Sequence, residues 1–448
     1  MLQSAGWELN EYTEETRYYR LESGRFPDLC AKVFQEKDIP IQVAIGNHDL
    51  GICGRDWIEE LLVKYPSSAL VKVKDLGYAR TALYVAVSRT STPEVTKTDA
   101  SVVRIASEYP NLAESFALKS RLRRFNIFPV WGAAEVYPPE SADLVLLAGR
   151  TGQELFNGDL LAVGKVLDSS AYLIANKDSW QSKDMGDILA PVYESLEQTA
   201  PVGTAEMSDR HPVKETPKIG TGAIRLALPD GHQQKPTVEL LNKADIKIED
   251  YPSPTGNRRP TIDLPGVAVK VIRPQDMPLQ VANGNFDLAL TGRDWLKEHL
   301  YRFPSSPVRE LLDLKFGWVR LVAVVSNKLP VSDVYSLRQL NAQRSTPFRI
   351  ASEYVNIADK YARENRLGMY RVIPTWGATE AFLPDDADLL IENTQTGRTL
   401  ARHNLKIIDT LFESTACLVA NTEALNSDKA TKIEPIVVIL RRAVEGGN

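Results

Sequence analysis

The sequence has little of what several protein classes require. It contains three cysteines, Cys30, Cys53 and Cys417, and no CxxC pair, which supports neither a disulfide framework nor a cysteine zinc site. Its five histidines form no HxxxH or HExxH pattern, so a histidine zinc site is not indicated either. The low cysteine usage favours a reduced, cytoplasmic location.

Excess basic charge and long apolar segments are also missing. The formal net charge is −5, so the composition gives no sign of binding to nucleic acid or to an anionic membrane. No apolar run approaches the roughly 20 residues that span a bilayer. The opening MLQSAGWELNEYTEE lacks a basic region and an apolar core, and we expect no signal peptide.

What the sequence does contain is one unit written twice. Its 448 residues exceed the length at which one hydrophobic core stops growing. Residues 41–57 (IQVAIGNHDLGICGRDW) match residues 279–295 (LQVANGNFDLALTGRDW) at eleven of 17 positions. Later motifs recur in the same order, namely RIASEY at 104–109 and 349–354, WGAAE at 131–135 and WGATE at 376–380, and SSAYLIAN at 169–176 and STACLVAN at 414–421. A repeat this long is a duplicated domain rather than a solenoid.

The duplication predicts copy one at residues 1–198, a linker at 199–222 and copy two at 223–448. The linker is rich in Pro, Gly, Thr and charged residues without apolar periodicity, so we expect it to be flexible, with an ordered surface crossing as the alternative. Because residues 1–6 align with 240–245, copy one lacks a counterpart of residues 223–239. Its sheet would miss a strand and expose backbone groups on the neighbouring one. Either another segment fills the gap or the start codon lies upstream.

Strands and helices alternate along copy two, which predicts an α/β fold with a mostly parallel sheet and helices on its faces. The expected strands are residues 223–229, 267–273, 286–292, 319–326, 348–354, 387–393 and 416–421. The expected helices are residues 236–244, 277–284 and 433–444.

The strongest local signal is the stretch ENTQTGRTL at residues 392–400, which follows the apolar strand ADLLI and opens a helix. Such a turn directs backbone N–H groups and the helix dipole at one spot and predicts an anion site. Gly397 allows close approach of the backbone, while threonine hydroxyls and the Arg398 guanidinium add donors. A capped helix after a tight turn is the alternative.

Copy two resembles ATP phosphoribosyltransferase, the first enzyme of histidine biosynthesis, over residues 223–421. The matching stretches are LPDG, IRPQDMP, GNFDLALTGRDW, LKFGWVRLVAV, RIASEY, WGATEAFLPDDADLLIE, NTQTGRTL and STACLVAN, in that order. The resemblance implies two tandem copies of a type II periplasmic-binding-protein-like fold with two lobes around a cleft. Lobe one of copy two would be 223–322 with 412–448, and lobe two would be 323–411. One helix after STACLVAN implies the short-form catalytic subunit.

The resemblance also implies the reaction. The phosphoribosyl group of phosphoribosyl pyrophosphate is transferred to N1 of ATP, and pyrophosphate is released with Mg²⁺ that is held mainly by the pyrophosphate itself. Since the adenine N1 lone pair is free at pH 7, a strong general base is not required. The protein has to hold both substrates in line and stabilise a cationic ribose and a departing polyanion.

Site residues follow from the same resemblance. The phosphate of phosphoribosyl pyrophosphate would be bound by Asn393, Thr394, Gln395, Thr396, Gly397, Arg398 and Thr399. The catalytic carboxylates near the ribose would be Glu380, Asp388 and Glu392, for which a turn cap and a surface pair are the alternatives. The ATP side would be lined by Arg273, Gly292, Arg293, Asp294, Ser352 and Tyr354. For Arg293 and Asp294 the alternative is a local ion pair at a helix N-terminus.

Two departures from the family pattern stand out. Where the family commonly has Lys-Gly-Arg after its first strand, this chain has Asp230-Gly231-His232, which weakens the positive charge there. In copy one, Leu147 replaces Glu392, Gln35 replaces Arg273, and Glu154 replaces Thr399; an acid in an anion pocket repels phosphate. We therefore expect copy one to be a non-catalytic partner that mimics a neighbouring subunit and supplies an arginine, with Arg20, Arg25 and Arg55 as candidates.

Three functions fit these observations. The intact NTQTGRTL favours an ATP phosphoribosyltransferase. The degenerate copy one and the Asp-Gly-His departure would fit a catalytically inactive ligand-binding or regulatory protein on the same fold. A phosphoribosyl transfer to another nucleophile is the third. For the enzyme, the resemblance implies ATP, phosphoribosyl pyrophosphate, a histidine-pathway regulatory subunit and a homo-oligomer as partners.

Overall fold

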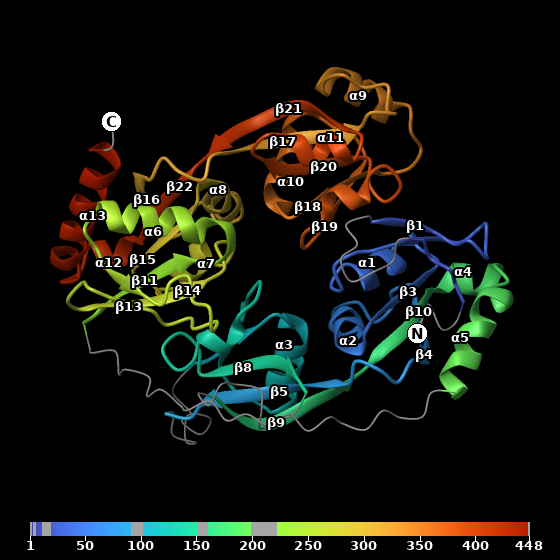
Figure 1. The fold of residues 1–448 in the computed structure, drawn as a ribbon, viewed down its shortest axis with the longest axis horizontal. Coiled ribbons are helices and arrows are strands. Elements are labelled where there is room, and N and C mark those ends of the chain that lie inside the picture. The colour runs from blue at the N-terminus through green and yellow to red at the C-terminus, as the bar shows by residue number, and fades with distance from the viewer. Residues whose placement is uncertain are drawn as a thin grey trace.

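The computed structural model describes residues 2, 6–10, 19–90, 102–150, 160–198 and 222–446. Apart from residue 222, the predicted linker lies outside these residues, so its flexibility stays a prediction. Each copy folds into two α/β lobes, as Figure 1 shows, which confirms the predicted fold class.

Lobe one of copy two is built on a five-stranded sheet in the order β14-β11-β15-β22-β16. Its strands are β11 (Ile224–Pro229), β14 (Val267–Ile272), β15 (Leu288–Gly292), β16 (Val308–Asp313) and β22 (Ala416–Asn421), with the small ribbon β12 (Ile248–Glu249) and β13 (Thr261–Ile262) beside them. Its helices are α6 (Gln234–Lys243), α7 (Met277–Ala282), α8 (Arg293–Arg302), α12 (Thr422–Leu425) and α13 (Ala430–Glu445). The first three strands are parallel, whereas β22 is antiparallel to β15 and β16 because it returns from lobe two.

Lobe two of copy two repeats this mixture in a sheet of order β19-β18-β20-β17-β21. The strands are β17 (Val319–Ser326), β18 (Phe348–Ser352), β19 (Tyr370–Pro374), β20 (Leu389–Thr394) and β21 (Leu405–Ser414), with helices α9 (Val334–Ala342), α10 (Val355–Glu364), η4 (Thr379–Phe382) and α11 (Arg398–Arg402). β17 and β21 pair from one end to the other, Val319 opposite Ser414. Both strands are part of the lobe-two sheet along their whole length.

Copy one has the same lobe two but a reduced lobe one. Its lobe two contains β5 (Thr81–Ser88), β6 (Val103–Ser107), α3 (Pro110–Lys119), β7 (Phe125–Pro129), η2 (Ala134–Val136), β8 (Leu144–Gly149) and β9 (Leu160–Ser169), in the sheet order β7-β6-β8-β5-β9. Its lobe one contains β1 (Arg20–Glu22), β2 (Cys30–Lys32), α1 (Ile39–Ala44), β3 (Leu50–Gly54), α2 (Arg55–Lys64), β4 (Leu70–Asp75), β10 (Ala171–Asn176), α4 (Lys177–Ser182) and α5 (Gly186–Gln198). The main sheet of this lobe has three described strands, β3-β10-β4, in place of five.

Trp7 packs on the first described strand of the main sheet in the reduced lobe one. It is 6% exposed, shares a hydrophobic cluster with Leu50 and Ile52 of β3, and donates from Nε1 to the carbonyl oxygen of Ile188 at 3.0 Å. Its counterpart in copy two, Ile246, packs in the same way on Leu288 and Leu290 of β15. Trp7 thus keeps the place that the duplication gives it, and the two explanations offered for the missing strand stay predictions.

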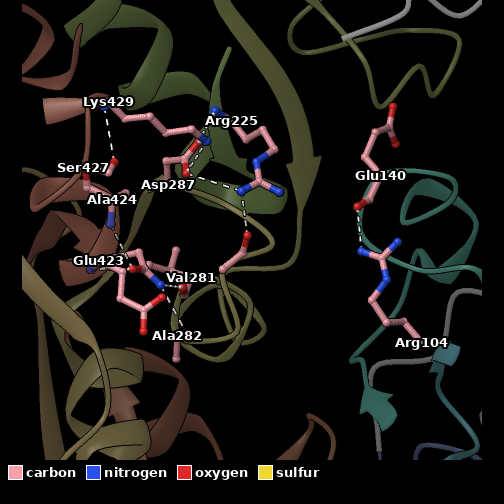
Figure 2. A network of polar contacts seen from close by, with 12 residues as sticks. Arg104, Glu140, Arg225, Val281, Ala282, Asp287, Glu423, Ala424, Ser427 and Lys429 are labelled. Atoms are coloured by element: carbon pink, nitrogen blue, oxygen red, sulfur yellow. Dashed lines mark hydrogen bonds and ion pairs between the residues drawn. The ribbon is translucent and has the colours of Figure 1, made fainter. Parts of the chain in front are cut away.

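A buried acid fastens the C-terminal helix to lobe one of copy two. Asp287, just before β15, accepts from the backbone N–H of Arg225 at 2.8 Å and from Nζ of Lys429 at 2.8 and 2.9 Å, as seen in Figure 2. Copy one has the same joint, since Asp49 accepts from Nζ of Lys183 at 2.8 and 2.9 Å. The joint between sheet and C-terminal helices thus survives the loss of the first strand.

The four lobes close into a ring (Figure 1), because each copy places its lobe one against lobe two of the other. Lys32 of copy one lies 2.6 Å from Asp386 and 2.9 Å from Asp385 of copy two. Its counterpart Lys270 lies 2.5 Å from Glu140 of copy one. Both lysine side chains are only 5% exposed. Since the same surfaces meet twice, the halves are related like the subunits of an isologous dimer.

The two copies also meet through their WGA motifs. The ring centroids of Trp131 and Trp376 lie 6.3 Å apart, and the backbone N–H of Trp131 donates to the buried carboxylate of Asp276 at 3.0 and 3.1 Å. One hydrophobic cluster combines side chains of copy one, such as Tyr137, with side chains of copy two, such as Met277. The interface is therefore partly a shared core.

The interface lysine should matter for stability. In Lys32→Ala, Asp386 loses a charged partner while it stays buried, so we expect the free energy of unfolding to fall by about 3 kcal/mol. Urea denaturation followed by circular dichroism measures it. Lys165→Ala is the control, because this exposed lysine pairs with Asp168 within copy one and its loss should leave the midpoint unchanged. Equal midpoints for wild type and Lys32→Ala would contradict the interface.

Candidate active site

The predicted anion loop lies on the surface at the carboxyl end of β20. Gly397 has φ 71°, a left-handed conformation that favours glycine. Its backbone N–H donates to Oγ1 of Thr394 at 2.9 Å. Gln395, Thr396, Arg398 and Thr399 are exposed, while Asn393 and Thr394 are half-buried. The loop is thus ordered by its own threonine and leaves its remaining donors accessible.

Three carboxylates gather next to this loop. Glu392 is the last but two residue of β20, accepts from the hydroxyl of Thr379 and from the backbone N–H of Asn393, and has its pKa raised by burial and by the charges of Glu353 and Glu380. Burial and the charges of Asp294 and Glu380 together raise the pKa of Glu353 to about 7. The structure therefore brings Glu380 and Glu392 together, as predicted, and adds Glu353, which sequence reasoning passed over although it stands between Ser352 and Tyr354 in the repeated RIASEY.

Asp388 does not join these carboxylates. It precedes β20, at the end of that strand opposite to Asn393, and is about 15 Å along the strand from it. Its carboxylate accepts from the backbone N–H of Arg349 at 2.8 Å and lies 3.0 Å from Arg344. The equivalent Asp143 binds Arg104 in the same way in copy one, which is the behaviour of a residue that fastens a strand.

A cavity of about 190 Å³ opens between the lobes of copy two. Lobe one contributes Arg273, Asp294 and the Trp295 ring, and lobe two contributes Glu353 and Asn393. The other lining residues are Asp230, Gly231, His232, Gln233, Pro274, Gln275, Gly317 and Val319. Asn393 belongs both to this cavity and to the anion loop, so the two features form one continuous site.

Asp294 joins the two lobes at the floor of the cavity. Its carboxylate accepts from Oη of Tyr354 at 2.5 Å and from Oγ of Ser414 at 3.0 Å. Oη of Tyr354 also accepts from Nδ2 of Asn393 at 2.8 Å, and Oγ of Ser352 donates to the carbonyl oxygen of Ile391 at 2.6 Å. Ser352 and Tyr354 are fully buried. These predicted ATP-side residues therefore hold other site residues in place from behind.

Gly292 and Arg293 begin α8 beside this network. A side chain at Gly292 would overlap the Asp294 carboxylate, so the close approach requires glycine. Arg293 forms an ion pair with Glu310 at 2.6 Å and another with Asp313 at 3.4 Å, and the Glu310 carboxylate raises the pKa of this guanidinium. Arg293 thus makes the local ion pairs that the sequence had offered as its alternative role.

The Asp-Gly-His departure has a structural counterpart at the mouth of the cavity. The Asp230 carboxylate lies 2.5 Å from Arg258 and 3.2 Å from Arg273. Burial alone would raise the pKa of Asp230, but the hydrogen bond and charge of Arg258, the backbone N–H of Gly231 and the charge of Arg273 together lower it. Arg258 was not predicted, because no repeated motif contains it. The acid that replaces a family cation therefore stands between two guanidinium groups.

Copy one approaches the site with a tyrosine instead of the expected arginine. Oη of Tyr19 donates to Oε1 of Glu380 at 3.4 Å. Among the candidate arginines, Arg20 pairs with Asp385 at 2.9 Å and Arg55 with Glu59 within copy one, while Arg25 stacks on Phe26. No sequence signal marked Tyr19. Its structural counterpart in copy two is Arg258, whose carbonyl oxygen accepts from the backbone N–H of Val271 as that of Tyr19 accepts from Val33.

Part of the degenerate copy-one loop can be compared. Leu147 packs at the edge of a hydrophobic cluster where copy two has Glu392. Residues 151–154, with the predicted Glu154, lie outside the described residues. Within the described ranges, no group of three or more His, Cys, Asp and Glu side chains could hold a metal ion, and no helix is long and apolar enough to cross a membrane.

Comparison with known proteins identifies the family. The model of the ATP phosphoribosyltransferase family matches residues 35–198 and again 273–442. ATP phosphoribosyltransferase of Pelotomaculum thermopropionicum is 33% identical over 227 residues, which cover 49% of this chain and 73% of that protein. The enzyme of Prosthecochloris aestuarii is 33% identical over 231 residues, covering 49% and 71%. The solved ATP phosphoribosyl transferase HisG:HisZ complex of Thermotoga maritima aligns with 22% identity and a TM-score of 0.41, over 50% of this chain and 99% of that one.

The duplicated two-lobed α/β fold with an interlobe cleft is therefore that of a transferase. The chain belongs to the ATP phosphoribosyltransferase family, in which it is a tandem duplication. Its activity is the transfer of the phosphoribosyl group to N1 of ATP, the first step of histidine biosynthesis. The predicted enzyme is confirmed, and the alternative of an inactive binding protein is not favoured.

The interlobe network yields a paired test. Tyr354→Phe removes a hydrogen bond to a buried carboxylate, and so does Tyr109→Phe in copy one, where Oη donates to Asp56 at 2.7 Å. Each change should lower the free energy of unfolding by about 2 kcal/mol. We expect only Tyr354→Phe to lower kcat/KM as well, roughly tenfold, because its partners line the cavity. An equal loss of activity in both variants would refute this assignment.

Proposed function

We propose that phosphoribosyl transfer takes place in copy two, residues 223–448, and that copy one, residues 1–198, is a non-catalytic partner joined by the linker 199–222. The observation that carries this proposal is the exposed loop 393–399 next to an interlobe cavity, with Asn393 shared by both. Copy one has an apolar Leu147 where copy two has Glu392, and an acid where copy two has Thr399.

The loop would bind the phosphate of phosphoribosyl pyrophosphate. The backbone N–H groups and hydroxyls of residues 393–399 supply donors in one small region, and Arg398 adds a bidentate cation. Glu380 and Glu392 stand beside the loop, where carboxylates accept from ribose hydroxyls and favour a ribose that becomes cationic. Asp388 holds the start of β20 through Arg349 and is not part of this catalytic pair.

ATP would occupy the cavity with Arg273 at its mouth and Asp294 on its floor. Its triphosphate would replace the Asp230 carboxylate as the partner of Arg273 and Arg258, since both guanidinium groups are already held at one place. Gly292, Arg293, Ser352 and Tyr354 would support the site by fixing Asp294 and Asn393. The adenine N1 would then face the ribose held by the loop.

Mg²⁺ would enter with the substrate. The described carboxylates form no preformed metal cluster, which suits an ion that keeps several waters and is bound mainly through substrate phosphates. When bound, it would neutralise charge on the leaving pyrophosphate. We also propose a cytoplasmic location and a separate histidine-pathway regulatory subunit as partner, since a relative of known structure is named as a complex of two proteins.

The assignment of residues 393–399 as the phosphate-binding loop can be tested by introducing a copy-one residue into copy two. Thr399→Glu places a carboxylate in the phosphate loop, so we expect turnover with ATP and phosphoribosyl pyrophosphate to fall at least about 1,000-fold while the thermal midpoint stays unchanged. The absorbance of the N1-substituted product follows the reaction. The matched reverse change, Glu154→Thr in copy one, should add no activity. A Thr399→Glu protein that keeps its turnover would show that the phosphate binds elsewhere.

Metal dependence gives an independent test. Treatment with a chelator should abolish turnover without changing the circular dichroism spectrum, because no described part of the fold is built around a metal. Adding Mg²⁺ should restore the rate. Full activity in the presence of excess chelator would contradict the role of the ion.

A further inference from the structure

Glu353 and Glu108 are counterparts in the two RIASEY motifs, but their surroundings carry opposite charge. Oε2 of Glu108 accepts from Nζ of Lys37 at 2.7 Å. On the other side, Arg273 of copy two reaches over: a methyl group at Gly132 would lie 3.3 Å from Nε of Arg273 and 3.9 Å from Oε1 of Glu108. The copy-one carboxylate is therefore flanked by a cation from each copy.

Both cations are replaced by glutamine around Glu353. Gln275 stands where copy one has Lys37, and Gln35 stands where copy two has Arg273. A methyl group at Gly377 would lie 3.7 Å from both Nε2 of Gln35 and Oε1 of Glu353, so the amide occupies the place of the guanidinium. Gln275 lines the same cavity as Glu353. The exchange removes positive charge from the copy that carries the intact loop.

Glu353 is left with no hydrogen bond or ion pair from any residue that the structure describes. Burial, together with the charges of the neighbouring acids Asp294 and Glu380, raises its pKa to about 7. Asp38 of copy one also faces it and is itself buried, with a pKa raised to about 8. Glu353 is half-buried and lines the cavity, so its unpaired carboxylate is open to a hydrogen-bond donor on a ligand.

The position of Glu353 restricts what that donor is. Its neighbours on the cavity wall are the flat ring of Trp295, which stacks on Tyr354 at 4.3 Å, and the amide of Asn393. An aromatic wall with one acceptor at its edge suits a planar heterocycle that carries an amino group. In copy one the ammonium of Lys37 lies 5.0 Å from the ring of Trp57, the counterpart of Trp295, and so marks where a nitrogen donor sits beside this carboxylate.

We propose that the Glu353 carboxylate accepts a hydrogen bond from the 6-amino group of the adenine ring of ATP, an inference that rests on the proposed placement of ATP in the copy-two cavity. During transfer the N1 lone pair forms the bond to C1′, while the C1′–O bond to pyrophosphate breaks and its electron pair leaves with pyrophosphate. The purine thereby gains a positive charge, which N1 shares with the 6-amino nitrogen. A carboxylate at that nitrogen binds the transition state more tightly than the ground state.

Purine riboside 5′-triphosphate supplies the test, because it retains N1 and lacks the amino group. Glu353→Met removes the acceptor at nearly constant length. We expect it to lower kcat/KM for ATP about 10- to 100-fold and to change kcat/KM for the analogue less than about threefold, since only ATP loses a hydrogen bond to a charged group. Calorimetry gives the dissociation constants of both nucleotides. Glu353→Met should weaken the binding of ATP more than that of the analogue, by a smaller factor than the change in kcat/KM.

The duplication offers the control. Glu108→Met makes the same change in copy one and should leave the preference for ATP over the analogue unaltered. If Glu353→Met keeps the wild-type preference for ATP over the analogue, the proposal is wrong, because Glu353 would then have only a structural role. Should Glu353→Met fail to fold by circular dichroism, Glu353→Leu also removes the acceptor, and an unaltered preference there overturns the proposal equally.

The outcome can be separated from that of the loop assignment. If Thr399→Glu is inactive and Glu353→Met keeps its preference for ATP, the placement of the substrates in copy two is supported and the proposed role of Glu353 is wrong. If Thr399→Glu is active, the placement of both substrates in copy two falls, and with it the proposed contact of Glu353.

Discussion

Closure of the four lobes into a ring is the constraint on which the other features of this chain depend. Lys32 and Lys270 each bury an ammonium group against acids of the opposite copy, and one hydrophobic cluster combines side chains of both copies. Ions this deeply buried are tolerated only with well-placed partners, so the two interfaces fix how the copies face one another. That placement brings Tyr19 and Gln35 of copy one to the copy-two site, and Arg273 of copy two to the copy-one site. A degenerate copy therefore has to keep its fold even where it has lost its chemistry.

Much of this architecture is readable from the sequence. The apolar runs placed seven strands of copy two to within about two residues, because buried strands in α/β lobes are bounded by glycine, proline or polar residues. The strands β12, β13, β16, β19 and β21 were not predicted. The repeat gave the duplication directly. The prediction of a mostly parallel sheet was right for four of the five strands in each lobe of copy two. It missed β22 and β17, which run against the others and whose direction depends on tertiary connections.

The site was predictable where it follows one continuous motif and unpredictable where it is assembled from distant segments. The exposed loop 393–399 and Glu392 belong to one continuous motif, and Glu380 belongs to the WGATE motif 12 residues before Glu392. Asp388 is close to Glu392 in sequence, yet the extended strand β20 runs between them and keeps the two carboxylates apart. Tyr19 and Arg258 lie outside the repeated motifs. Tyr19 reaches the site across the interface between the copies, whereas Arg258 binds Asp230 within copy two. Glu353 was overlooked because its identity is the same in both copies; only its neighbours differ.

Fusion into one polypeptide has a genetic consequence. In a homodimer, any substitution at the residue that reaches into the neighbouring subunit appears in both active centres at once, so it can be retained only if both tolerate it. Here Gln35 and Arg273 occupy the same structural position but are encoded separately, and each has been adapted to a different neighbour. Covalent linkage also makes the association of the halves independent of dilution. A fused protein can therefore evolve two different centres, whereas a symmetric homodimer cannot.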